Sequence, residues 1–346
     1  MKRFYFILAG LLLSVVFYGQ DNKWLNDKPG TWRFENHLPE KSYSLRNGTL
    51  SAADNTAFKK NMATLAEWFR QNHPMLQTPV GYDLRAIANW MWSDYTTRAE
   101  AEYGIPATLD FLFEIFDDKG GRWTVEPPQY GILVNSITGG HQGLYFTPES
   151  IVEDGSRYDL SRSEDVRKAR ERLWQYFPVS WYKESPCPGV DVYSANTGSP
   201  EQIVVYNHDR PPYWLPVTVQ ELADASLAYY SLFQKIEIDR MVYDQLKSEI
   251  AELSPEELAA PAYYGHGSHF VLQVNGKGQG LQIMRFNPEY WDRSLPASAI
   301  QFMSFFNPGV GIEEMAEYRQ RQGHPHYPQQ FADRMRWDEI VKIINK

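Results

Sequence analysis

Apolar residues recur every three or four positions in several stretches of the chain, the spacing that places side chains on one face of a helix. The first stretch begins after Ser51, the second after Ser161 and the longest after Thr218. Each of these residues is followed three positions later by an aspartate or glutamate, the capping-box pattern of a helix start. The longest stretch weakens at Asp239 and Arg240, where we expect a break or kink. The other predicted helices are residues 84–95, a turn at residues 254–257 and a closing segment from Pro328.

Elsewhere the pattern changes to a period of two, which predicts strands. Residues 109–116 alternate in this way, and a Gly-Gly turn at residues 117–121 follows them. This order favours an antiparallel meander over a further helix. The other predicted strands are residues 123–126, 132–137, 190–193, 203–206, 270–274, 281–286 and 299–305.

One order of elements occurs twice in the second half: a hairpin, an asparagine, a Tyr-Trp pair and a proline. Because each half of the chain shows a helical stretch followed by strands, we predict an α+β fold of two related lobes, each a long helix followed by an antiparallel β-meander. The lobes are residues 21–185 and 186–346, because a proline-rich connector separates them. Chance similarity of short patterns is the alternative explanation. The two copies contain Asn207, Tyr213 and Trp214, and Asn287, Tyr290 and Trp291.

Residues 1–20 have the features of a secretory signal peptide. Lys2 and Arg3 precede an apolar run at residues 4–17, which is shorter than the ~20 residues that a bilayer-spanning helix needs. An uncleaved N-terminal anchor is the alternative. We expect export to the periplasm or the extracellular space, with no transmembrane segment once the signal is removed.

Charge and cysteine content exclude two classes of interaction. Removal of residues 1–20 takes away two positive charges and changes the net charge from −9 to −11, so nucleic acid is not an expected partner. Cys187 is the only cysteine, and no intrachain disulfide can form. It lies in a Pro-Cys-Pro segment that offers no helix N-terminus to activate a thiol, which indicates a structural role.

No catalytic or cofactor motif is complete in the sequence. Ser180 and Lys183 match the spacing of a serine acyl-enzyme, but prolines bracket the segment and the remaining motifs are missing. His266 with His269, and His324 with His326, are too few for a metal site, and we expect solvated loop histidines. The glycine-rich segment 276–280 lies between two predicted strands, unlike a phosphate-binding loop. We therefore predict no cofactor and no metal, and the catalytic residues, if any, are unknown.

The two Tyr-Trp loops are the candidate ligand-binding site, because loops on a rigid sheet often carry function and aromatic rings suit sugars, peptides or apolar molecules. The alternative is that these aromatic residues only plug the end of each lobe. We expect Trp214 to be packed and Trp291, between charged neighbours, to be more exposed. The candidate ligand-binding residues are Asn207, His208, Tyr213, Trp214, Asn287, Tyr290, Trp291 and Asp292.

Three functions follow as hypotheses. The first is a non-catalytic secreted or periplasmic protein that binds a glycan, a peptide or an envelope component through its aromatic loops. The second is a hydrolase of a carbohydrate or cell-wall polymer, which needs only two suitably spaced carboxyl groups and leaves no sequence motif. The third is a structural partner in an assembly, which a broad exposed aromatic patch would favour.

We predict that export removes about the first 20 residues, because the charged start and short apolar run are those of a cleaved signal. Mass spectrometry of the protein isolated from its native host measures the mature N-terminus. Recovery of chains that begin at Met1 in the membrane fraction would show that the segment is an anchor instead.

Overall fold

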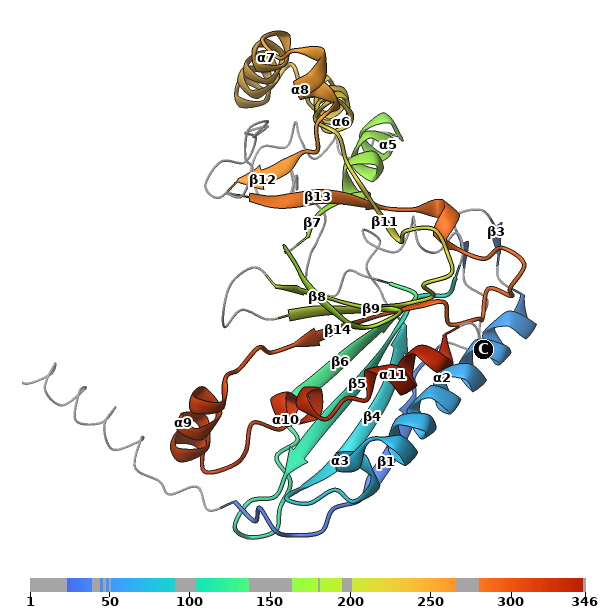
Figure 1. Cartoon of the computed structure of the whole chain (residues 1–346), viewed down its shortest axis with the longest axis vertical. Helices are drawn as coiled ribbons and strands as arrows, with labels where there is room; N and C mark the ends of the chain where they lie inside the picture. Colours follow the sequence, from blue (N-terminus) through green and yellow to red (C-terminus); the bar gives the residue numbers. More distant parts are fainter. Residues whose placement is uncertain are drawn as a thin grey trace, which may run out of the picture.

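The computed structural model describes residues 24–38, 44–45, 48–49, 51–90, 104–136, 164–179, 181–194, 201–265 and 280–344. The fold is α+β, and its main feature is an eight-stranded mixed sheet (Figure 1). Its strands lie in the order β1 (Trp32–Asn36), β4 (Tyr82–Trp90), β5 (Ala107–Ile115), β6 (Gln129–Val134), β14 (Phe302–Asn307), β10 (Glu201–Tyr206), β9 (Val190–Ser194) and β8 (Trp181–Cys187). Only the pair of β1 and β4 is parallel among these neighbours.

One face of the large sheet is apolar and packs against helices. Alternate residues of each strand, such as Leu84 and Ala86 in β4, enter one hydrophobic core with the helices on this face. The longest of these helices begins with the expected capping box, in which the Ser51 hydroxyl accepts from the Asp54 amide and the Asp54 carboxylate accepts from the Ser51 amide. The helices are α2 (Ala52–Asn72), α3 (Pro74–Gln77), α10 (Tyr327–Asp333) and α11 (Trp337–Ile340).

A second, smaller sheet lies beyond the opposite face, with its own helices (Figure 1). Its central strand β13 (Gly280–Phe286) pairs with β7 (Tyr176–Val179) on one edge and with β11 (Trp214–Pro216) and β12 (Tyr263–Gly265) on the other. A second hydrophobic core joins this sheet to helices α5 (Glu164–Trp174) and α6 (Val219–Ser231). The remaining elements are β2 (Ser44–Leu45), β3 (Gly48–Thr49), α7 (Glu237–Ala251), α8 (Pro255–Ala259), η2 (Pro288–Tyr290), α9 (Ile312–Gln322) and η3 (Val341–Ile343).

Several local predictions are confirmed. The strands at residues 109–116, 190–193, 203–206 and 281–286 correspond to β5, β9, β10 and β13, and the capping box at Thr218 begins α6. Pro328 lies in the first turn of α10, as expected. The predicted strand 270–274 lies outside the described residues, as does Ser161.

Three local predictions are wrong. Residues 84–90 form strand β4 rather than a helix, because alternate side chains from Tyr82 onward are buried in the core. Residues 123–126 form no strand, and Glu126 has a left-handed backbone with φ 48°. The break in the long helical stretch lies at residues 232–236, whereas Asp239 belongs to the first turn of α7.

The arrangement of two related lobes is not confirmed. Strand β14 from the second half pairs with β6 from the first half, so both halves share one sheet. The predicted boundary at residues 185 and 186 falls inside strand β8. None of the helices in the described part of the chain combines the length and the apolar character needed to cross a lipid bilayer.

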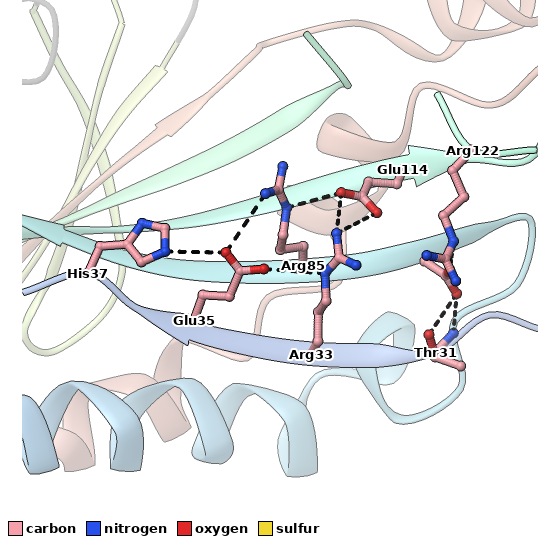
Figure 2. A network of polar contacts seen from close by, with 8 residues as sticks. Thr31, Arg33, Glu35, His37, Arg85, Glu114 and Arg122 are labelled. Carbon is pink, nitrogen blue, oxygen red and sulfur yellow. Dashed lines mark hydrogen bonds and ion pairs between the residues drawn. The ribbon is translucent and has the colours of Figure 1, made fainter. Parts of the chain in front are cut away.

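An ion-pair network joins β1, β4 and β5 on the face away from α2 (Figure 2). Arg33 and Arg85 stand opposite each other in register, which places two positive charges side by side. The carboxylate of Glu114, 1% exposed, lies 2.7 Å from Arg33 Nη2 and 3.0 Å from Arg85 Nε. Glu35 contacts Arg33 at 3.5 Å and His37 at 3.3 Å, and thus extends the network toward solvent. Glu114 therefore offsets the repulsion between the two arginines.

Substitution Glu114→Ala should lower the free energy of unfolding by about 2 kcal/mol, because it removes charged hydrogen bonds from a buried carboxylate and leaves two adjacent arginines. Glu35→Ala is the matched control: its side chain is 33% exposed, so its loss should cost less than about 1 kcal/mol. Urea denaturation measures both. Equal effects of the two substitutions would contradict the role assigned to Glu114.

Candidate functional site

The structure brings the two Tyr-Trp loops together between the two sheets. The first loop (residues 207–214) and the second loop (residues 287–292) supply rings to one buried aromatic cluster. Trp214 is 5% exposed and Trp291 is 2% exposed. The expectation that Trp291 is the more exposed of the two is therefore wrong. Its indole ring stacks on Phe286, with ring centroids 5.4 Å apart, while Glu289, two residues earlier, remains at the surface.

Hydrogen bonds between the loops satisfy backbone groups that strand pairing does not reach. The Asn287 side chain donates to the carbonyl of Pro212 at 2.6 Å, and its backbone amide donates to the carbonyl of Tyr213 at 2.8 Å. In return, the backbone amide of Asn207 donates to the Tyr290 hydroxyl at 3.0 Å. That hydroxyl donates to the carbonyl of Gln301 at 2.6 Å. These asparagines and tyrosines thus fasten the loops to each other.

Arg210, which the sequence did not single out, completes this contact. Its Nε donates to the carbonyl of Tyr290 at 2.8 Å, and its Nη2 donates to the carbonyl of Trp291 at 2.7 Å. A guanidinium with fixed, planar donors suits this binding of successive carbonyls. Arg210 and Tyr290 lie 80 positions apart in the sequence, so no local pattern could have revealed their contact.

The last two predicted residues are His208, which is exposed, and Asp292, which is partly exposed. His208 forms a 3.5 Å contact with Asp209. Asp292 accepts hydrogen bonds from the hydroxyl of Ser294 at 2.6 Å and from its amide at 2.9 Å, and these bonds lower the pKa of Asp292. The eight predicted residues therefore lie in one region, but most of them are occupied in holding the loops together.

A different group next to this region is partly open to solvent. We call it the tyrosine–aspartate cluster: Tyr182 on β8, Asp191 and Tyr193 on β9, Tyr206 at the end of β10, and Tyr213 of the first loop. The residues on the three strands lie on the sheet face opposite α2, since their neighbours Val190, Val192 and Val205 enter the helix-side core. Tyr182 is 58% exposed, whereas Tyr213 is buried.

A chain of hydroxyl groups leads to the carboxylate of this cluster. The Tyr213 hydroxyl donates to Asp191 Oδ2 at 2.6 Å and lies 2.6 Å from the Tyr193 hydroxyl. Because Tyr213 has one proton, which it donates to Asp191, Tyr193 must donate to Tyr213. The rings are also close, with centroids 4.6 Å apart for Tyr206 and Tyr213 and 5.9 Å apart for Tyr182 and Tyr193.

Three hydroxyl groups of the cluster, those of Tyr193, Tyr206 and Tyr213, remain neutral across the physiological pH range. Burial, followed by the charge of Asp191, raises the pKa of Tyr206 to about 12. Burial also raises the pKa values of Tyr193 and Tyr213. The cluster therefore offers neutral hydroxyl groups, aromatic rings and one carboxylate.

Other chemistry-bearing groups are less well placed for function. Asp110, on the same face of the large sheet, accepts from the Thr108 hydroxyl at 2.8 Å, yet burial raises its pKa. Burial raises the pKa of Cys187, which disfavours a reactive thiolate.

His324 is buried beside Trp24 and Tyr318, so the expectation of a solvated loop residue is wrong there. His266 and His269 lie outside the described residues. Across the residues that the structure describes, no three His, Cys, Asp or Glu side chains are grouped to hold a metal ion.

Comparisons of the chain with protein-family models, with curated proteins and with solved structures give no match.

Substitution Trp291→Ala should lower the free energy of unfolding by about 3–5 kcal/mol, the usual cost of emptying a buried aromatic site. Trp123→Ala is the control, because Trp123 is 36% exposed and its loss should cost much less. Thermal and urea denaturation separate the two. An unchanged melting temperature for Trp291→Ala would contradict the buried position of this ring.

Proposed function

We propose that the protein is an exported, non-catalytic binding protein and that the tyrosine–aspartate cluster is its binding surface. The ligand belongs to the classes expected from the sequence, namely a glycan, a peptide or an envelope component. One observation carries this proposal: a carboxylate and linked tyrosine hydroxyls lie beside the exposed ring of Tyr182.

The cluster suits recognition because it combines contact area with directed polar groups. Tyrosine gives a large rigid ring with few rotatable bonds and a hydroxyl that can donate or accept. Three of the five residues lie on strands β8 and β9, and a fourth ends β10, so the sheet fixes their positions. Because these residues are already ordered, binding of a ligand here costs little free energy for ordering the protein.

Binding is favoured over the alternative of a hydrolase. Hydrolysis by paired carboxyl groups requires an acid with a raised pKa and a second carboxyl group at a suitable distance. Burial raises the pKa of Asp110, which accepts hydrogen bonds from Thr108 and Asn89. One such group is half of a hydrolytic pair, whereas the tyrosine–aspartate cluster combines several rings and hydroxyl groups suited to recognition.

Substitution Tyr182→Ala should weaken ligand binding about fivefold or more, as truncation of a contact aromatic commonly does. It should leave the melting temperature nearly unchanged, because the side chain is 58% exposed. The ligand is first sought with an array of oligosaccharides, soluble cell-wall fragments and peptides, and affinity is then measured by calorimetry.

Val125→Ala is the matched control, since Val125 is 74% exposed and lies on the connection between β5 and β6, away from the cluster. A ligand that binds both variants as tightly as the unaltered protein would place the binding surface elsewhere.

A further inference from the structure

Several carboxylates on the large sheet have a cation beside them. Glu114 contacts Arg33 and Arg85, Asp83 contacts Arg122, and Glu201 contacts Lys183. Each of these pairs neutralises a negative charge that the fold has partly removed from water. This pairing is expected, because a charge in a low-dielectric environment is costly unless it is compensated.

Asp191 departs from this pattern. Its side chain is half-buried, and no lysine, arginine or histidine of the described chain forms an ion pair with it; its contacts are tyrosines. Neutral hydroxyl groups satisfy hydrogen bonds but do not cancel a charge. Among the described residues, the cluster therefore has one carboxylate with aromatic rings and without a cation beside it.

Resting on the proposed binding function, we propose that the cluster binds an organic cation, a protonated amine or a quaternary ammonium group. The carboxylate of Asp191 supplies charge complementarity, and the faces of the tyrosine rings attract a cation that lies within about 6 Å of a ring centroid. The exposed ring of Tyr182 provides the outer wall of this site. An organic cation is favoured over a divalent metal because the cluster contains one carboxylate, and calcium requires six to eight oxygen ligands.

The experiment compares choline with 3,3-dimethylbutan-1-ol, which has the same shape without the charge. Binding to the full chain is followed by calorimetry and by chemical-shift changes of the tyrosine rings. We expect choline to bind at least about tenfold more tightly than the alcohol, the discrimination that a charged contact provides. Its affinity should fall as salt is added, because salt screens the attraction. Equal affinity for the two probes would overturn the proposal.

The substitution Asp191→Asn removes the charge and keeps the shape, and it should weaken choline binding about tenfold. Asp209→Asn is the control, since Asp209 is 82% exposed in the neighbouring loop and should leave choline binding unchanged. If Asp191→Asn does not fold, the comparison of choline with its neutral isostere in the unaltered protein decides the question. An Asp191→Asn protein that folds and binds choline normally would overturn the proposal.

Two further binding measurements identify the source of the cation and distinguish a failure of the cation proposal from a failure of the proposed binding function. A lysine peptide, a trimethyllysine peptide and free choline all present an ammonium group, and the tightest binder indicates whether the source is a chain or a small molecule. Binding of a neutral oligosaccharide that Tyr182→Ala abolishes, together with no binding of choline, would overturn the cation and leave the binding function intact.

Discussion

The contact between the two Tyr-Trp loops determines how the two sheets are held together. Irregular backbone buried between sheets must find hydrogen-bond partners, because an unpaired buried amide or carbonyl costs about 1–3 kcal/mol. Here each loop supplies those partners to the other, through Asn287, Tyr290 and the guanidinium of Arg210. The aromatic rings then fill the space between the sheets. The hydrogen bonds between the loops and this packing therefore act together to hold the small sheet on the large one.

The same contact builds the proposed binding surface. Tyr213 belongs to the buried aromatic cluster through its ring and to the tyrosine–aspartate cluster through its hydroxyl. The hydrogen bonds between the two loops fix the position of Tyr213, and its hydroxyl in turn orients Asp191 and Tyr193. A change that loosens the loops should therefore disturb ligand binding as well as stability. This dependence links the proposed binding surface to the junction between the sheets.

The sequence predicted features that depend on near neighbours and failed where distant residues decide. The helix start at Thr218 was predictable because its cap bonds lie within four residues. Strand β5 was predictable because apolar and polar residues alternate along it. The same alternation is weaker in β4, where small alanines take several of the apolar positions. The pairing of β6 with β14 and the contacts of Arg210 join residues far apart in sequence, and no local pattern encodes them. Trp291 was misjudged because its charged neighbours stay at the surface while its ring turns inward.

Two carboxyl groups on one sheet face show why Asp191, and not Asp110, is assigned to binding. Burial raises the pKa of Asp110, so the fold disfavours its charge, although Thr108 and Asn89 donate hydrogen bonds to it. Asp191 accepts a hydrogen bond from the Tyr213 hydroxyl, and aromatic rings rather than cations are its neighbours among the described residues. A carboxylate beside ring faces suits a cationic ligand, because the carboxylate and the faces of the rings attract the same charge. The placement of Asp191 among tyrosines is therefore the feature that distinguishes it from Asp110.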